Sequence, residues 1–517
     1  MQDFVQQYEW AKKDKDDGIP EKRILMIKQN NDKNQASEEW DAKNTLVKSD
    51  DFKKFKTIVK GGNRFVLTRN YLYVAKIGKE KKKVLSYARR TSDFTKFTDM
   101  RISEKGIHKF DFNIVEMSTG GVFLFLTRPD KNIQAGNMYI SDNKGARFTV
   151  TLQGVPYLTK HEFDFIEVKS LPGVYIANVY DKIAKATEEE YLDYYTDGNE
   201  KRPSKRPVKK LPDRKTMITF NGGGDWSPIP APAKSSAGKT IKCDIIKGCS
   251  LHLHNLSSNK YPFPYSVKSA IGLIIGVGNI GTQLSDLDKD LNTYFSRDGG
   301  LTWYEILKGP HIAEYGDHGG IIAMAPFKHA FYIIYSANEG MTWNKVKLSR
   351  PSQISNILIE PNSISTRFCV IGSINHHLKN GESKNTGALM SVDFSELHQN
   401  QCQGLNTLLD PNSDYELWSP SNGLINSNDD ACFYGKKTQF IRRKRDRKCI
   451  NGELIEKEIF EQNCECTRKD YECDEGYKLM ENGNCEPVDA NQTVTAPEDC
   501  QDYYYINRGY RKIPGDS

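Results

Sequence analysis

A short motif recurs along this chain and constrains its fold more than any other feature. Residues 296–303 (Ser-Arg-Asp-Gly-Gly-Leu-Thr-Trp) and 336–343 (Ser-Ala-Asn-Glu-Gly-Met-Thr-Trp) share the pattern Ser-x-Asp/Asn-x-Gly-x-Thr-Trp. Weaker or degenerate copies occupy residues 219–226, 141–148, 86–94 and 49–55. Each copy follows an apolar run, which predicts a hairpin turn. Its Asp or Asn bonds backbone amides, its Gly accepts a positive φ, and its final aromatic covers the apolar underside.

The segments between the copies are short runs of β-branched and aromatic residues bounded by Gly, Asp, Asn and Pro. Tyr71–Ile77 and Gly121–Thr127 are examples. This pattern predicts strands, and the spacing of the motif predicts blades of about 40–50 residues, with insertions or skipped copies. The motif is the Asp-box, which occurs in β-propellers that include sialidases and sorting receptors. We therefore expect an all-β propeller in which the motif's Asp has a structural role.

Cysteine spacing replaces the strand pattern as the organising signal near the C-terminal end. Of the 11 cysteines, eight lie between Cys402 and Cys500. Such density is typical of a small disulfide-stapled module in an oxidising compartment. Since the strand pattern fades near Phe394, we predict propeller blades over residues 1–398 and a cysteine-rich module over 399–517. A zinc site at Cys464, Cys466 and Cys473 is the alternative, but the usual C-x2–4-C knuckle spacing is missing.

Charge and hydropathy exclude several classes of partner. The formal net charge of +6 is too small for a chain of this length to indicate nucleic-acid binding. The longest apolar stretches, Ala270–Val277 and Gly319–Phe327, are shorter than the roughly 20 residues that span a bilayer. The N-terminus has no basic region followed by an apolar one, so no signal peptide is visible. Together with the cysteines, this predicts a piece of a longer secretory protein.

Five segments, taken in order, resemble the luminal domain of sortilin and of the yeast vacuolar protein sorting receptor, the Vps-ten-type domain. No single segment is specific, but the ordered set is. The segments are Cys243–His254, Ser296–Ile322, Cys432–Gly452, Cys464–Tyr477 and Gly509–Asp516. The resemblance implies a ten-bladed propeller followed by a module of ten cysteines. The motif copies would account for about the second half of that propeller, and the module would stop short of its last cysteines.

The family's disulfide pairing can be carried onto the matching cysteines. It implies the pairs Cys243–Cys249, Cys402–Cys449, Cys432–Cys464 and Cys473–Cys485. Cys466 and Cys500 would pair with cysteines beyond Ser517. Cys369 has no counterpart in the family, and its neighbours Phe368, Val370 and Ile371 predict a buried free thiol in a strand.

The resemblance also implies a peptide-binding site in the propeller tunnel, where a basic side chain holds the ligand's C-terminal carboxylate. Lys82 falls at the basic position, with a one-residue uncertainty over Lys81–Lys83. Tyr73, Phe112 and Ile114 fall at the apolar positions. Sortilin has arginine at the basic position, and lysine lacks the bidentate fork of arginine. The alternative is that Lys82 lies in a solvated hairpin tip near core aromatics.

Histidines and sequons suggest two further features of a secretory receptor. His252, His254, His311 and His318 could make ligand release depend on pH, or they could be satisfied structural residues. The sequons Asn255-Leu-Ser257 and Asn491-Gln-Thr493 permit N-glycosylation at Asn255 and Asn491. Because Asn255 directly follows the histidine pair, it could instead lie at a strand end and stay bare.

The functional hypothesis is the luminal ligand-binding region of a sortilin-like type I receptor in the Golgi and endosomes. Its partners would be peptide or protein cargo such as vacuolar or lysosomal hydrolases, without nucleic acid, and it would be anchored through a segment absent from this chain. We predict no catalytic residue, no metal and no cofactor. One alternative is an Asp-box glycosidase, but no Arg-Ile-Pro segment opens a blade as in sialidases. A secreted adhesion propeller is the other.

Overall fold

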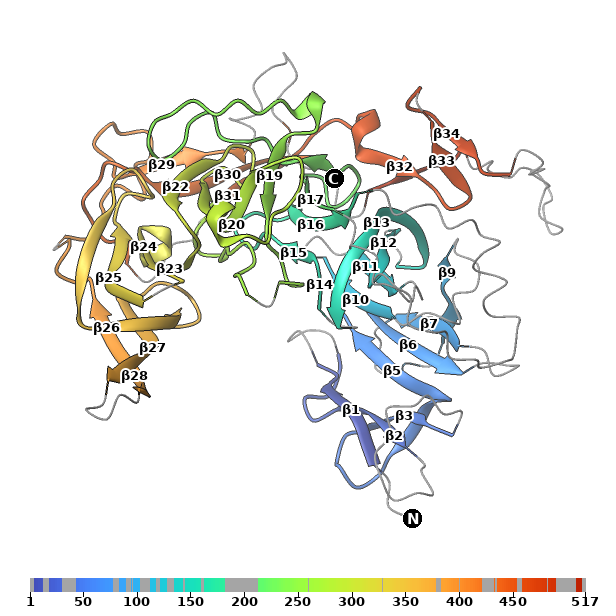
Figure 1. Ribbon diagram of the computed structural model, residues 1–517. Helices are drawn as coiled ribbons and strands as arrows, with labels where there is room; N and C mark the ends of the chain where they lie inside the picture. Colours follow the sequence, from blue (N-terminus) through green and yellow to red (C-terminus); the bar gives the residue numbers. More distant parts are fainter. Residues whose placement is uncertain are drawn as a thin grey trace, which may run out of the picture. The chain divides into compact units, whose positions relative to one another are not determined.

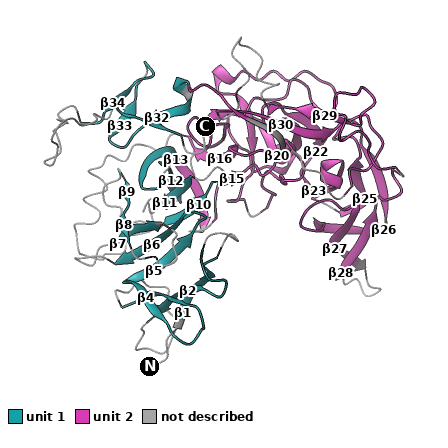
Figure 2. Cartoon of the chain, turned by 180° about the vertical axis from the view of Figure 1, so that it is seen from behind, with its two compact units in different colours: residues 1–153, 467–515 teal, residues 154–466, 516–517 magenta. Residues whose placement is uncertain are grey.

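The fold consists of β-sheets, which confirms the all-β prediction (Figure 1). No helix in the described part of the chain is long and apolar enough to cross a membrane. The chain forms two compact units, Met1–Gln153 with Thr467–Gly515, and Gly154–Cys466 with Asp516–Ser517 (Figure 2). The computed structural model describes residues 4–12, 18–29, 43–77, 83–89, 94, 96–102, 112–117, 121–127, 134–142, 145–159, 162–181, 213–258, 260–327, 329–377, 383–398, 400–420, 432, 435–452, 458–480, 482–489 and 508–513.

The first unit contains three sheets in which sequence neighbours pair antiparallel, and two short strand pairs. The first sheet consists of β1 (Phe4–Trp10), β2 (Ile24–Gln29), β3 (Thr45–Ser49) and β4 (Lys56–Lys60). The second consists of β5 (Gly62–Leu67), β6 (Tyr71–Ile77), β7 (Lys83–Arg89) and β8 (Thr98–Asp99). The third consists of β10 (Phe112–Glu116), β11 (Val122–Thr127), β12 (Ala135–Ser141) and the start of β13 (Arg147–Thr159), with β9 (Arg101–Ile102) parallel to β13. The short pairs are β32 (Tyr471–Cys473) with β35 (Tyr510–Lys512), and β33 (Tyr477–Leu479) with β34 (Cys485–Pro487), preceded by η7 (Arg468–Asp470).

The second unit repeats the same antiparallel pattern. The end of β13 pairs with β14 (Glu162–Phe163). The next two sheets consist of β15 (Phe165–Glu167), β16 (Tyr175–Tyr180), β17 (Arg214–Thr219) and β18 (Ser227–Pro228), and of β19 (Ser250–Leu253), β20 (Ile274–Gly281), β21 (Asn292–Ser296) and β22 (Tyr304–Lys308). A six-stranded sheet follows with β23 (His311–Gly316), β24 (Ile321–Pro326), β25 (His329–Ser336), β26 (Asn344–Leu358), β27 (Arg367–His377) and β28 (Ser383–Asp393). The last sheet consists of β29 (Tyr415–Trp418), β30 (Lys436–Arg443) and β31 (Glu458–Asn463), and the 3-10 helices are η3 (Ile245–Lys247), η4 (Asp288–Asp290) and η5 (Asp317–Gly319).

Antiparallel four-stranded meanders of this kind are the blades of β-propellers, so the propeller architecture that the motif predicts is present. The full count of ten blades stays a prediction. Strand β28 ends at Asp393, shortly before the division expected at residue 398. The two compact units divide the chain elsewhere, so that domain boundary also stays a prediction.

The Asp-box turns form as the residue pattern predicts. In the turn after β21, the Ser296 hydroxyl accepts a hydrogen bond from the Gly300 amide at 2.8 Å, and Asp298 Oδ1 accepts one from the Thr302 amide at 2.8 Å. Gly299 and Gly300 have φ values of 70° and 100°, which explains the need for glycine. Trp303 is buried, and its indole N–H donates to the Gly300 carbonyl. The Asp side chain is thus committed to the turn and has a structural role.

Two further copies use these hydrogen bonds, one fully and one in part. After β25, the Ser336 hydroxyl accepts from the Gly340 amide at 2.8 Å, and Asn338 Oδ1 accepts from the Thr342 amide at 2.9 Å. The degenerate copy after β3 retains them in part, since Asp51 Oδ1 accepts from the Lys54 amide at 2.8 Å. A copy that is hard to recognise in the sequence therefore still builds the turn.

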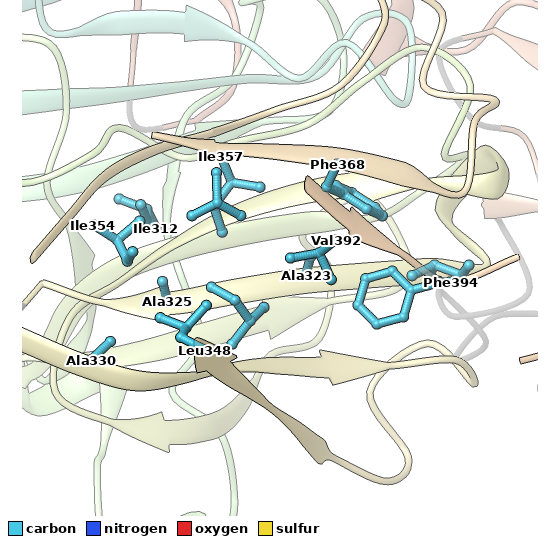
Figure 3. Packing of buried hydrophobic residues seen from close by; sticks show 13 residues of the cluster. Ile312, Ala323, Ala325, Ala330, Leu348, Ile354, Ile357, Phe368, Val392 and Phe394 are labelled. Carbon is cyan, nitrogen blue, oxygen red and sulfur yellow. The ribbon is translucent and has the colours of Figure 1, made fainter. Parts of the chain in front are cut away.

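The packing of a blade is seen most clearly in the six-stranded sheet (Figure 3). The first part of the long strand β26 pairs with β25 and its last part pairs with β27. Inward-facing residues from all six strands form one hydrophobic cluster, which includes Ile312, Ala323, Leu348, Ile357, Phe368 and Val392. Alternation along each strand places these apolar side chains on one face.

Alternation also corrects one sequence expectation. Cys369 was expected to be a buried thiol, but it is exposed on β27. Its neighbours Phe368 and Val370 are both buried. Because successive side chains of a strand point to opposite faces, burial of these two neighbours turns Cys369 outward.

Candidate functional site

The apolar residues of the expected peptide site come together in the first unit. Tyr73 on β6 and Phe112 and Ile114 on β10 belong to one hydrophobic cluster that also contains Ala75. Their exposed fractions are 1%, 4% and 6%. Burial raises the pKa of the Tyr73 phenol, so it stays neutral, and its hydroxyl contacts the Gly145 carbonyl at 3.4 Å. In the structure these three side chains have a packing role, and their role in ligand binding stays a prediction.

The structure describes one of two basic residues of interest near this site. Lys82 lies outside the described residues. A second cation, which sequence reasoning missed, is Arg64 on β5: its guanidinium donates to the Phe112 carbonyl at 2.8 Å and lies 5.4 Å from the centre of the Phe112 ring. Arg64 pairs with Ala75 across β5 and β6. Only this strand register brings Arg64 to the cluster, so the linear sequence contains no direct signal for it.

Three of the four candidate pH-sensing histidines, namely His252, His254 and His311, are buried. His252 Nδ1 accepts from the Thr216 amide at 3.2 Å, and His254 Nε2 lies 3.1 Å from the Ser285 carbonyl. Desolvation lowers the pKa of His252, His254 and His311 to about 4. These three rings therefore stay neutral at the pH of an endosome, which favours the structural interpretation over a release switch. The fourth, His318, contacts the Gly452 carbonyl through Nε2 at 2.8 Å.

The first sequon does not present its asparagine to solvent. Asn255 is 1% exposed, and its amide contacts the Ile176 carbonyl at 3.4 Å. The hydroxyl of Ser257 donates to the buried Asp164 at 2.7 Å. This burial favours the bare strand end over a glycan at Asn255, and the occupancy of the sequon stays a prediction. Asn491 lies outside the described residues.

The structure contains the four disulfides that the family resemblance implies. They join Cys243 to Cys249, Cys402 to Cys449, Cys432 to Cys464, and Cys473 to Cys485. Because Cys464 and Cys473 each form a disulfide, their sulfurs are not available as zinc-binding thiolates in this structure. Among the described residues, the group Cys402, Asp414 and Cys449 brings potential metal ligands together, but its two cysteines also form a disulfide. The partners of Cys466 and Cys500 stay a prediction.

Arginines of the cysteine-rich region bind the carbonyls of Asp-box turns, and we call this set (Arg442, Arg443, Arg445 and Arg511) the arginine clasp. Arg442 donates to the Arg297 carbonyl and Arg443 to the Ala337 carbonyl, both at 2.8 Å. These carbonyls belong to the second residues of the two strongest Asp-boxes. Arg445 donates to the Glu339 carbonyl at 2.8 Å. In the first unit, Arg511 donates to the Ile140 carbonyl at 2.7 Å, next to the copy at 141–148.

Arg443 is the buried centre of the clasp in the second unit. Its side chain is 2% exposed and forms an ion pair at 3.5 Å with Asp317, which is fully buried. It also donates to the carbonyls of Gly320 at 3.0 Å and of Cys449 at 2.5 Å. A buried charge needs both a counter-ion and hydrogen bonds to offset its desolvation, and Arg443 has both.

The cavity beside the clasp is too small for a ligand. Its volume of about 20 Å³ suits a single water molecule. Two lining atoms, Nε of Arg442 and Nε of Arg443, are buried and have no hydrogen-bond partner within the described structure. The cavity is therefore part of the packing between strands and no candidate active site.

The sheets, the Asp-box turns and the disulfides define the class: a β-propeller with a disulfide-bonded C-terminal region. Comparison with known proteins agrees. The family model described as sortilin, neurotensin receptor 3, matches residues 1–357, and the model of its C-terminal part matches residues 359–517. The chain therefore belongs to the sortilin family, and the resemblance read from the sequence is confirmed.

Individual proteins that are similar to this chain have names that fit this family. The chain is 30% identical over 93% of its length to vacuolar protein sorting/targeting protein 10 of Pyrenophora teres f. teres. It is 32% identical over 79% of its length to the human sortilin-related receptor, and 30% identical over 87% to an uncharacterized membrane glycoprotein of Saccharomyces cerevisiae. It spans 31%, 18% and 38% of the lengths of these three relatives. None of the three names describes a hydrolase.

Proposed function

We propose that this chain is the luminal ligand-binding region of a sorting receptor that carries soluble protein cargo from the Golgi to endosomes or the vacuole. The observation that carries the proposal is the match of both sortilin-family models, in order, along residues 1–357 and 359–517. The printed names of the relatives, a vacuolar protein sorting/targeting protein and a sortilin-related receptor, support transport as the activity.

The disulfide bonds of this chain suit an oxidising compartment such as the lumen of the secretory pathway. Four disulfides stabilise the described structure, and such bonds persist in the secretory pathway and not in the cytosol. Attachment to the membrane would be supplied by a segment outside this chain. One relative is named a membrane glycoprotein, and this name supports the proposed attachment to a membrane.

The proposed peptide site lies beside β6 and β10. Lys82 would bind the C-terminal carboxylate of the cargo peptide, and Tyr73, Phe112 and Ile114 would form the apolar wall behind it. Lysine offers a point charge, whereas arginine offers a planar fork. We therefore expect weaker selection for carboxylate geometry than in a receptor with arginine at this position.

The test measures binding of immobilised receptor to propeptides of vacuolar hydrolases by surface plasmon resonance, at pH near 7 and near 5. Binding of a propeptide at either pH supports the proposal, and absence of binding to every propeptide at both pH values contradicts it. The variant Lys82→Ala tests the site separately. The matched control is Lys60→Ala, since Lys60 is an exposed lysine of the neighbouring sheet. If propeptides bind but both variants bind equally well, the receptor function stands and the Lys82 site is wrong.

A further inference from the structure

A loop of the second unit is bound at both ends by buried carboxyl groups. It leaves β19 at His254, whose amide donates to the Val277 carbonyl at 2.8 Å. It rejoins the same sheet at Tyr265, which exchanges two backbone hydrogen bonds with Ile275. We call its described residues, 255–258 and 260–265, the 255–265 loop.

Asp164, which directly precedes β15, holds the start of this loop. Its side chain is fully buried, and it accepts hydrogen bonds from the backbone amide of Ser257 and from the Ser257 hydroxyl, the latter at 2.7 Å. Asn178 of β16 donates to the same carboxyl group at 3.1 Å. The start of the loop is therefore bound to the preceding sheet through an acid that is shielded from water.

Glu314 of β23 holds the end of the loop in the same way. It is 7% exposed, and its Oε1 accepts hydrogen bonds from the Tyr265 hydroxyl at 2.6 Å and from the Tyr315 amide at 2.9 Å. The rings of Tyr265 and Tyr315 stack with their centres 5.5 Å apart. The end of the loop is thus bound to the following sheet, again through a buried acid.

A third carboxyl group contacts the middle of the loop from the surface. Asp288 accepts hydrogen bonds from Lys260 and from the Tyr261 hydroxyl, but its side chain is 54% exposed. These two bonds, that of Lys260 first, lower the pKa of Asp288, so it stays charged in mild acid. Asp288 therefore offers a comparison: an exposed acid that holds the same loop without titrating in this range.

Burial gives Asp164 and Glu314 the opposite behaviour. Desolvation disfavours their charged forms and raises the pKa of both above the ordinary values of 3.8 and 4.5. The charge of Arg214 acts against the shift at Asp164, whereas the charge of Glu360 adds to the shift at Glu314. The phenols near the two acids also have raised pKa values and stay neutral; they belong to Tyr180, Tyr265 and Tyr315.

Protons favour the closed form of this loop, because only the closed form keeps the two acids out of water. Opening the loop would return Asp164 and Glu314 to solvent and to their ordinary pKa values. The closed loop therefore binds protons more tightly than the open loop does. Closure is favoured progressively as pH falls through the raised pKa values toward 3.8 and 4.5.

We propose that the 255–265 loop is a clamp that closes in acid: it opens locally at neutral pH and stays closed once Asp164 and Glu314 have taken up protons. That the chain meets an acidic compartment rests on the proposed function, whereas the response of the loop to pH does not. Phe263, which is 44% exposed between two prolines of this loop, would be held in one position in acid and released at neutral pH.

The test is hydrogen–deuterium exchange of the 517-residue chain, read by mass spectrometry of peptides that cover the loop, at pH near 7 and near 5. Labelling times are scaled to the intrinsic exchange rates, so that protection factors at the two pH values can be compared. We expect the protection of the loop to increase in acid, by up to about tenfold for each pKa unit by which closure raises either acid.

The double variant Asp164→Asn, Glu314→Gln removes both titrations and resembles the protonated acids, so its loop should be equally protected at both pH values. Each single variant should lose part of the increase, and the single variants decide the matter if the double variant does not fold. Asp288→Asn is the matched control. It should lower the protection at both pH values and keep the increase in acid.

The proposal is overturned if the loop of the wild-type chain is no better protected near pH 5 than near pH 7. It is also overturned if the variants of Asp164 and Glu314 keep the full wild-type increase, and melting temperatures check that each variant is folded. Because no cargo is present in this experiment, its failure would leave the proposed receptor function standing.

Discussion

Replacing Arg443 by alanine tests whether the arginine clasp holds the cysteine-rich region against the blades. The variant leaves the fully buried Asp317 carboxylate without its cationic partner, and it leaves the carbonyls of Gly320, Ala337 and Cys449 without their donor. Asn451 still donates to Asp317 through its backbone amide at 2.8 Å, so the loss is incomplete. Breaking a buried ion pair by removing one partner costs about 3–5 kcal/mol.

The assay is thermal unfolding followed by circular dichroism at neutral pH. At roughly 2–4 °C per kcal/mol for a large domain, we expect a melting temperature lowered by about 6–20 °C. Arg367→Ala is the matched control, because Arg367 pairs with Asp393 at 2.7 Å with side chains 71% and 39% exposed. An exposed pair of this kind contributes at most about 1 kcal/mol. A loss for Arg443→Ala no larger than for Arg367→Ala would refute the reasoning.

A double variant separates burial of charge from loss of packing. Asp317 has a positive φ of 47°, a conformation that asparagine tolerates. Asp317→Asn combined with Arg443→Met removes both charges while keeping most of the volume. If the uncompensated carboxylate causes the instability, this double variant should be more stable than Arg443→Ala. Equal instability would indicate that the lost carbonyl bonds matter more than the charge.

Three further predictions concern pH, the disulfides and glycosylation. Because the pKa of His311 is about 4 in the fold and 6.5 in the unfolded chain, its stabilisation is complete above pH 6.5 and is lost as pH falls toward 4. His311→Gln should therefore lose about 2 kcal/mol less stability than the wild type between pH 7 and pH 5, and equal losses in denaturant titrations would contradict this. Replacing Cys402 and Cys449 by serine opens a loop with a sequence separation of 47 and should cost about 4 kcal/mol in the same assay; opening the separation of 6 between Cys243 and Cys249 should cost about 2 kcal/mol. Equal costs would show that loop entropy does not set them. Mass spectrometry of secreted protein should find Asn255 without a glycan, and an occupied site would show that this region folds differently.

Much of the fold could be predicted because its signals are local. An Asp-box needs a hydroxyl, an Asp or Asn and a glycine within a few residues, and the side chains of Ser296 and Asp298 make the expected bonds to nearby amides. Even the degenerate copy at residues 49–55 keeps such a bond at Asp51. The disulfide pairing was predictable for another reason, namely that the family pattern assigns each cysteine a partner.

The features that could not be predicted depend on which face of a strand a residue occupies, or on contacts with distant segments of the chain. The run Phe368-Cys-Val-Ile371 is apolar throughout, so it does not show which alternate residues face inward, and Cys369 was placed on the wrong face. Arg64 reaches Phe112 only through the register of β5 with β6. In the sequence alone, a charged run such as Arg442-Arg-Lys444 is typical of a solvent-exposed surface. The acceptors that bury its arginines lie more than a hundred residues earlier in the chain.

That separation has a consequence for synthesis on the ribosome. Arg442 binds a carbonyl 145 residues earlier in the chain, and Arg511 binds one 371 residues earlier. At about 5–20 residues per second, the turns emerge many seconds before the arginines that bind them. The blades must therefore keep their turn carbonyls hydrated until the later segment arrives. Completion of the fold is thus tied to translation of the cysteine-rich region.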